Sequence, residues 1–195
     1  MLTLRASTGY EVSVAPSNIH SLAFVYKGWE GFNQSLISAL DGLSSEHLAF
    51  RSSTEMRTVG EIFWHISAGR VDWFRRLPAP GSAELQKEIE ARQAGGAPFD
   101  ADELAEWLRR TWVMVDATLR QWSVEDLAAT YPHGYQGTTY AVSRQWTIWR
   151  IMAHDIYHGG QLSELLAMQG VIPLELTILG GHLTVPAIVE PTDNV

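Results

Sequence analysis

The chain has 195 residues, of which 46% are hydrophobic and 18% charged, with a net charge of -8 and no cysteine. This length predicts one domain, residues 1–195, with a sizeable buried core. The charge argues against a nucleic-acid binder, the apolar runs are too short to span a membrane, and the lack of cysteine excludes disulfides and thiolate metal sites. Residues 1–5 begin no signal-peptide pattern, so we expect a cytoplasmic protein.

The first half of the chain predicts two amphipathic helices after a short arm. Residues 2–14 alternate in polarity, which is typical of a hairpin or an irregular arm. Residues 18–42 repeat large apolar side chains at spacings of three and four, the period of a helix. Thr58 and Glu61 have the spacing of a capping box, so a second helix begins there and ends at Pro78.

The middle of the chain predicts a crossover and a third helix. Residues 81–98 are polar and rich in Ala and Gly, which indicates a mobile crossover with a helical turn around residues 85–92. Asp100 and Glu103 form another capping pattern. The apolar stripe of the third helix follows them and reaches Trp122.

The last part of the chain predicts a fourth helix. Residues 129–142 combine turn-forming and aromatic residues, which indicates a loop or a small hairpin. Ser143 then caps a helix that ends at Gly170, and residues 176–185 could form a hairpin. Four amphipathic helices bury their apolar faces compactly in an antiparallel bundle. We therefore expect an all-α four-helix bundle, with short β segments at the termini.

Two histidines in the fourth helix suggest a metal site. His154 and His158 are four residues apart, so they lie on one helical face and can converge on one ion. Two ligands rarely hold a metal, and His65 borders the apolar stripe of the second helix as a candidate third ligand. Three histidines would leave a fourth position for water or substrate, as in catalytic sites.

Each histidine also has an ordinary interpretation. A single histidine on an amphipathic helix usually lies at the interface and donates to a carbonyl group. The spacing of the histidines does not by itself show that the second and fourth helices face each other. The bare pattern therefore leaves both interpretations open.

The two segments that carry the histidines resemble one protein family. Residues 146–170, WTIWRIMAHDIYHGGQLSELLAMQG, closely resemble the last helix of the DinB/YfiT-like superfamily, and residues 58–66, TVGEIFWHI, resemble its second helix. The resemblance implies a four-helix bundle in up-down-down-up order, commonly a homodimer, with a three-histidine site for a divalent metal, usually zinc or nickel. Matched by motif, the three ligands are His65, His154 and His158.

The resemblance also implies a class of reaction. Characterised relatives use the metal to activate a low-molecular-weight thiol, such as mycothiol or bacillithiol, in transferase or isomerase reactions, and others resemble metal-dependent hydrolases. We therefore expect a metal-dependent enzyme with a small-molecule substrate, either a thiol-dependent S-transferase or, second, a metal-assisted hydrolase. The alternative is a non-catalytic, stress-related metal- or ligand-binding protein.

Three polar residues near the histidines are catalytic candidates. Glu61 lies one turn before His65 and could act as a general base or accept a hydrogen bond from a metal-binding histidine, although its capping role is favoured. Tyr157 could donate into a pocket or pack at a helix seam. Gln161 could bind a metal water or substrate, or fill a polar gap. Asp155 is expected to be a surface or interface charge.

The tryptophans and the remaining histidines carry weaker signals. Several tryptophans recur at helical spacing, which is more typical of a core or a dimer interface than of a cofactor site. These tryptophans are Trp29, Trp64, Trp73, Trp112, Trp146 and Trp149. Among the remaining histidines, His133, in the segment before the fourth helix, could approach the metal site.

Overall fold

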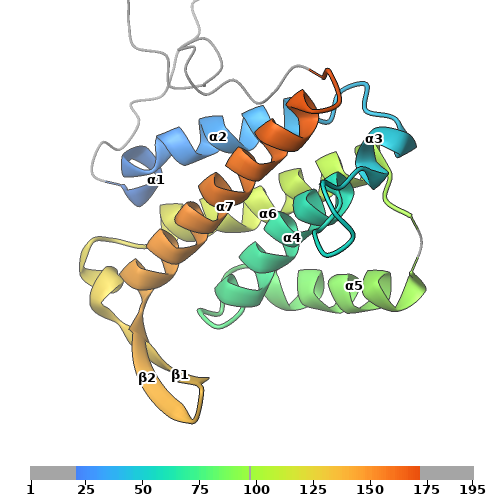
Figure 1. Cartoon of the computed structure of the whole chain (residues 1–195). Helices are drawn as coiled ribbons and strands as arrows, with labels where there is room; N and C mark the ends of the chain where they lie inside the picture. The colour runs from blue at the N-terminus through green and yellow to red at the C-terminus, as the bar shows by residue number, and fades with distance from the viewer. Residues whose placement is uncertain (1–20, 97, 172–195) are drawn as a thin grey trace, which may run out of the picture.

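The computed structural model describes residues 21–96 and 98–171, which are mostly helical (Figure 1). The bundle consists of α1 Leu22–Val25 with α2 Lys27–Ser38, α4 Val59–Phe74, α6 Ala101–Gln121 and α7 Arg144–Ala167. The connections contain α3 Ser45–Ala49, α5 Ser82–Gly95, the 3-10 helix η1 Glu125–Ala128, and the strands β1 Thr130–Tyr135 and β2 Thr138–Ser143. The strands expected within residues 2–14 and 176–185 lie outside the described residues. No helix within the described ranges is both long and apolar enough to cross a membrane.

The four long helices form the expected bundle. Helices α2 and α7 run in one direction, and α4 and α6 run in the other, which is the up-down-down-up order (Figure 1). Helix α4 packs against both α6 and α7, and α2 packs against the same two helices. The apolar faces of all four helices meet in one cluster of buried side chains. The predicted all-α bundle is confirmed, and its described β structure lies between α6 and α7.

The predicted starts of the second, third and fourth helices are confirmed by their hydrogen bonds. Thr58 N donates to Glu61 Oε2 at 2.7 Å, and Glu61 N donates to Thr58 Oγ1 at 3.1 Å, which completes the capping box of α4. The side chains of Asp100 and Ser143 cap α6 and α7. After α7, Gly170 adopts a φ of 73°, the left-handed conformation in which helices commonly end.

The crossover between α4 and α6 is a full helix, so the prediction of a single helical turn was wrong. Helix α5 buries Leu85 and Ile89, which lie four residues apart on one face. Outside the buried face, Arg110 of α6 donates to both carboxylate oxygens of Glu88 at 2.6 and 2.7 Å. The polar residues between these anchors are mostly strong helix formers, which the sequence interpretation underweighted.

A two-stranded hairpin connects α6 to α7, within the segment predicted as a loop or small hairpin. Strands β1 and β2 are antiparallel, with Thr130 opposite Ser143 and Tyr135 opposite Thr138. The turn residues at positions 136 and 137 both have positive φ values, 48° and 77°, as in the tight turns that match strand twist. The hairpin projects beyond the end of the bundle where α7 begins (Figure 1).

The tryptophans divide between the core and the surface. Trp29 and Trp64 are buried, as predicted, and Trp29 contacts Trp112 edge-on with the ring centroids 5.5 Å apart. In contrast, Trp146 and Trp149 on α7 are 42% and 59% exposed. The core interpretation is therefore confirmed for Trp29 and Trp64, and the alternative of a dimer interface stays a prediction for Trp146 and Trp149.

Candidate metal centre

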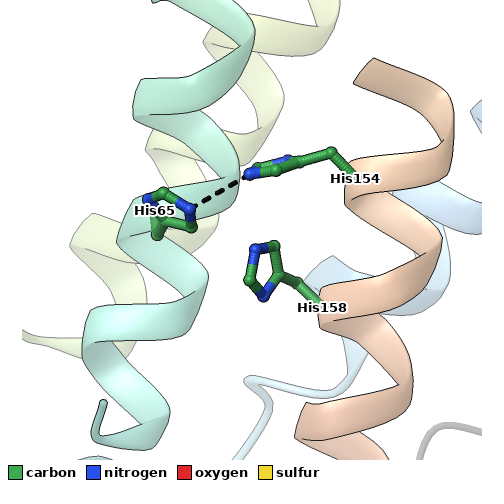
Figure 2. A group of neighbouring side chains, drawn as sticks. All are labelled: His65, His154 and His158. Atoms are coloured by element: carbon green, nitrogen blue, oxygen red, sulfur yellow. Dashed lines mark hydrogen bonds between the residues drawn. The ribbon is translucent and has the colours of Figure 1, made fainter. Parts of the chain in front are cut away.

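The three candidate histidines meet between α4 and α7. His65 projects from α4, and His154 and His158 project toward it from α7 (Figure 2). Each offers one ring nitrogen, and these three atoms lie within 4.8 Å of one another. Two of them, His65 Nε2 and His154 Nε2, are 3.1 Å apart. Such a cluster of nitrogens could hold a metal ion.

A glycine makes room for this arrangement. Gly69 lies on α4 one turn after His65, and the imidazole of His154 lies against it. A Cβ atom added at Gly69 would be only 2.8 Å from His154 Cε1, which is closer than carbon atoms can approach. The missing side chain therefore lets the ring of His154 reach across to His65.

The distances and the donor chemistry fit a bound divalent ion. In a tetrahedral site with metal–nitrogen bonds of about 2.0–2.1 Å, neighbouring ligand nitrogens are about 3.3 Å apart. The 3.1 Å between the Nε2 atoms of His65 and His154 is close to this value. Without an ion, one of these two nitrogens must carry a proton to avoid facing lone pairs. An ion would use both lone pairs.

Gln161 fixes the orientation of the third imidazole. His158 Nδ1 lies 2.7 Å from Gln161 Oε1, and an amide oxygen can only accept, so the Nδ1–H donates. In the neutral ring this leaves the lone pair on Nε2. The amide nitrogen of Gln161 donates to the Tyr157 hydroxyl at 3.2 Å, which supports this orientation of the amide. Gln161 and Tyr157 thus lie beside the cluster, and their catalytic roles stay a prediction.

Asp155 supports the cluster from the core, so its predicted surface position was wrong. Its side chain is 0% exposed, and Oδ2 accepts from Arg70 Nε and from Trp29 Nε1, both at 2.8 Å. Its other oxygen, Oδ1, lies 3.5 Å from His154 Nδ1. Both of these atoms are buried, and neither has a hydrogen-bond partner among the described residues. A small rotation of the His154 ring would let Nδ1–H donate to this carboxylate, a common arrangement behind metal-bound histidines.

Burial favours the neutral form of His65 and His158, which is the form that binds a metal. The pKa of His65 falls from 6.5 to about 4, mainly because burial penalises the charged ring. The positive charge of Arg57 lowers it further, and His154 and His158 contribute in the same direction. Burial is also the main cause that lowers the pKa of His158. At neutral pH both rings therefore have a lone pair available.

The remaining candidates do not join the cluster. The carboxylate of Glu61 is held by the backbone of Thr58 in the cap of α4, which confirms its favoured structural role. His133 lies on β1, where Arg76 Nη1 donates to its Nδ1 at 2.7 Å. Within the described residues, the group that could hold an ion contains the three predicted histidines and no carboxylate.

A cavity of about 460 Å³ adjoins the site on the side of Gln161. Arg57, Glu55 and Glu164 supply charged groups to its wall, and Ile62 and Leu165 supply apolar ones. The three histidines do not line this cavity, but Gln161 belongs both to its wall and to the hydrogen-bond pair with His158. The cavity beside the histidine cluster is therefore large enough to hold a small molecule.

The sequence interpretation missed the buried pair of Arg70 and Asp155, although a signal for it was present. Asp155 is four residues after Ile151 and seven before Leu162, both of which are buried on α7. Arg70 is four residues after Ile66 in the same way on α4. An acidic and a basic residue that each lie on the buried face of a helix, by their spacing from apolar residues, indicate an ion pair in the core.

Comparisons with known proteins agree with this fold. The model of the DinB superfamily matches residues 29–162, which include all three histidines. The crystal structure of a DinB-like protein from Bacillus cereus is similar, with a TM-score of 0.60 and 20% identity over 87% of this chain and 99% of that one. A DinB-like protein from Bacillus subtilis has a TM-score of 0.52 and 16% identity, over 80% and 94% of the two chains. No curated protein matches the sequence. Because the family match covers more than half of the sequence, the chain belongs to the DinB superfamily.

Proposed function

We propose that the protein is a metal-dependent enzyme in which His65, His154 and His158 bind one divalent ion, zinc or nickel. The observation that carries this proposal is the convergence of three imidazole nitrogens within 4.8 Å. It is supported by the hydrogen bond that Gln161 accepts from the far nitrogen of His158. Partners behind the ligands are typical of metal sites, since they fix the tautomer and the direction of the lone pair.

Three protein ligands suit a catalytic role better than a structural one. Structural zinc sites are usually closed by four protein ligands, whereas catalytic sites keep one position open. A divalent ion at such a site supplies Lewis acidity and lowers the pKa of a thiol or water bound to it. The residues of the chain would then orient the substrate. The ring of Tyr157 lies beside that of His158, with their ring centroids 5.1 Å apart.

Thiol-dependent transfer is our first choice of reaction. No carboxylate belongs to the described histidine cluster, and Asp155 is already engaged by Arg70 and Trp29. The site therefore lacks an adjacent base of the kind that helps to activate water. A thiol needs less help, because its ordinary pKa of about 8.5 is already close to neutral. Metal-assisted hydrolysis is the second choice, with Glu55 or Glu164 in the adjoining cavity as the available carboxylates.

The remaining parts of the proposal concern substrate, assembly and location. The small-molecule substrate would occupy the cavity beside Gln161, where Arg57 offers a positive charge. The family resemblance suggests a homodimer, and the composition suggests a cytoplasmic protein. The alternative function is a non-catalytic, stress-related protein that binds a metal or a ligand with the same residues.

An activity screen on zinc- or nickel-loaded protein separates these functions. We would offer mycothiol or bacillithiol with the electrophile 1-chloro-2,4-dinitrobenzene, measure thioether formation, and test simple esters and amides for hydrolysis in parallel. The proposal predicts thioether formation that is lost in His158→Ala and kept in His47→Ala, a histidine in the cap of α3. Equal rates of thioether formation in the two variants would contradict the proposal that the three histidines form the active metal site. A loaded protein that catalyses neither reaction would favour the binding alternative.

A further inference from the structure

A second cavity, of about 590 Å³, lies where the hairpin meets the ends of α4 and α7. This volume is within the range of roughly 300–1,000 Å³ that is typical of small-molecule sites. Aromatic rings from both helices and from the hairpin form most of its wall, with one arginine among them. These residues are Trp73, His133, Tyr135, Tyr140, Trp146 and Arg150.

This aromatic cavity is separate from the histidine cluster. Trp73 comes eight residues after His65 on α4, and Trp146 comes eight residues before His154 on α7. Eight residues of helix span about 12 Å. His65, His154 and His158 do not line the aromatic cavity, although Arg150 on its wall is one helical turn before His154. Binding of a small ligand against Trp73 and Trp146 would therefore not require a metal.

The rings on the wall hold one another in place. The ring centroids of Trp73 and Trp146 are 5.3 Å apart, and those of Trp73 and His133 are 5.0 Å apart. The guanidinium of Arg76 lies 4.5 Å from the Trp73 ring centroid and also donates to His133. Such contacts between rings and cations fix the position of the wall before any ligand arrives.

The aromatic surface of this cavity is open to solvent. Trp146, Tyr140 and Tyr135 are 42%, 50% and 59% exposed. Large apolar side chains that gather on a surface usually mark a binding site, whereas single ones need no explanation. Aromatic faces arranged around a hollow suit a flat ring that can stack on them.

The charge of the cavity selects an anion. Arg150 is the single charged residue on the described wall, and it makes no hydrogen bond or ion pair with the described residues. The nearby carboxylate of Asp72 is engaged by Arg75 and Arg76, at 3.0 and 2.8 Å. Although the chain has a net charge of -8, this cavity presents a positive group.

We propose that the aromatic cavity binds a small, flat aromatic molecule that carries a carboxylate or another anionic group. The ring stacks on Trp146 and the anion pairs with Arg150. This site is additional to the metal centre, and its occupancy does not depend on the metal-dependent activity proposed above.

Calorimetric titration of the metal-free chain with 2-naphthoate, and with neutral 2-naphthol as the matched probe, tests this site. Trp146→Ala should weaken 2-naphthoate binding about tenfold, as expected for the loss of a stacked ring. Trp149→Ala is the control, since Trp149 is exposed on the same helix but does not line the cavity. It should leave affinity within about twofold of the wild type. The wild type should prefer 2-naphthoate over 2-naphthol by about two- to fivefold, and Arg150→Gln should remove that preference.

Two results would overturn the proposal. The first is no binding of either probe to the wild type; a wild-type dimer that Trp146→Ala dissociates in sedimentation velocity would then show that the surface is a subunit interface. The second is an equal loss in Trp146→Ala and Trp149→Ala, because the probe would then be adhering to exposed tryptophans in general. Circular dichroism checks that each variant is folded, and the Arg150→Gln comparison does not depend on removing a ring.

Discussion

At the scale of single residues, the side chains behind the histidines decide how the imidazoles present their nitrogens. Gln161 accepts from His158 Nδ1, and the buried carboxylate of Asp155 faces His154 Nδ1. The bond to Gln161 holds the far side of the His158 ring, and a small rotation of His154 would let Asp155 hold that ring in the same way, which leaves the near side of each ring for an ion. The account therefore assigns measurable roles to residues that would not touch the ion.

Gln161→Ala should weaken zinc binding about 10- to 100-fold while leaving the free energy of unfolding of the metal-free protein nearly unchanged. The physical reason is that His158 loses the acceptor that fixes its tautomer. Competition with a chelator measures the affinity. Glu164→Ala is the matched control, because Glu164 lines the same cavity on the same helix. If both variants bound zinc as tightly as the wild type does, Gln161 would have no positioning role.

Asp155→Leu should destabilise the protein by about 3–5 kcal/mol, because it leaves the buried guanidinium of Arg70 without its countercharge. The double variant Asp155→Leu/Arg70→Met should be more stable than Asp155→Leu, since no buried charge is left unpaired. Urea unfolding gives both free energies. A double variant that is as unstable as the two single variants added together would show that the pair is not coupled.

Lowering the pH from 6.5 toward 4 should destabilise the metal-free protein, because His65 binds a proton less readily in the folded state than in the unfolded state. The folded pKa of His65 is about 4, below the ordinary 6.5, so the unfolded chain binds more protons between these values. The free energy of unfolding therefore rises with pH in this range and falls as the pH drops from 6.5 toward 4. His65→Gln should show a shallower dependence in urea unfolding at a series of pH values. An unchanged slope in that variant would contradict the assigned pKa.

The sequence predicted which residues belong to the site better than it predicted what surrounds them. The spacing of His154 and His158 places both on one face, and the capping box fixes the register of α4, which carries His65. The depth of Asp155 depends on where α7 meets its neighbours. Helical spacing places Asp155 about 100° around the helix from His154, but packing decides whether that direction leads to solvent or to the core.

At the scale of the elements, close approach between helices depends on small residues. Gly159 of α7 lies against the ring of Phe32 from α2, and a Cβ atom there would be 2.4 Å from Phe32 Cζ. The next residue, Gly160, has nothing within 4 Å of such an atom. Of these two adjacent glycines, only Gly159 is needed for the close packing of α7 on α2.

Gly159→Ala should lower the free energy of unfolding by about 1–3 kcal/mol, because the buried ring of Phe32 has to move. Gly160→Ala should raise it by up to about 1 kcal/mol, because alanine favours the helix and finds open space. Urea unfolding of the two variants compares them directly. Similar changes in both would contradict the close packing of α7 on α2.

The elements also show where a sequence pattern is hard to interpret. The capped ends of α4, α6 and α7 were predictable because one side chain bonds the backbone a few residues away. Helix α5 was not, because it has few apolar residues and its polar face resembles that of a loop. Its burial of Leu85 and Ile89 depends on contacts with the rest of the bundle, which short-range patterns do not contain.

At the scale of the whole molecule, the order of the helices assembles the cluster. Since α4 and α6 run in the same direction, the chain needs the crossover helix α5 between them (Figure 1). This order sets α7 antiparallel to α4, so the middle of α7 lies opposite His65 (Figure 2). Periodicity alone predicted a bundle but did not determine which helices are neighbours. That part of the expectation came from the family resemblance of residues 58–66 and 146–170.

The central claim is that the cluster of His65, His154 and His158 binds a divalent ion, and metal analysis tests it most directly. We would measure the metal content of untagged protein, purified without a metal-affinity column, by plasma mass spectrometry, alongside His154→Ala and the control His47→Ala. The account predicts about one zinc or nickel ion per chain in the wild type and the control, and loss of this ion in His154→Ala. A metal-free wild type that also fails to take up added zinc or nickel would contradict it.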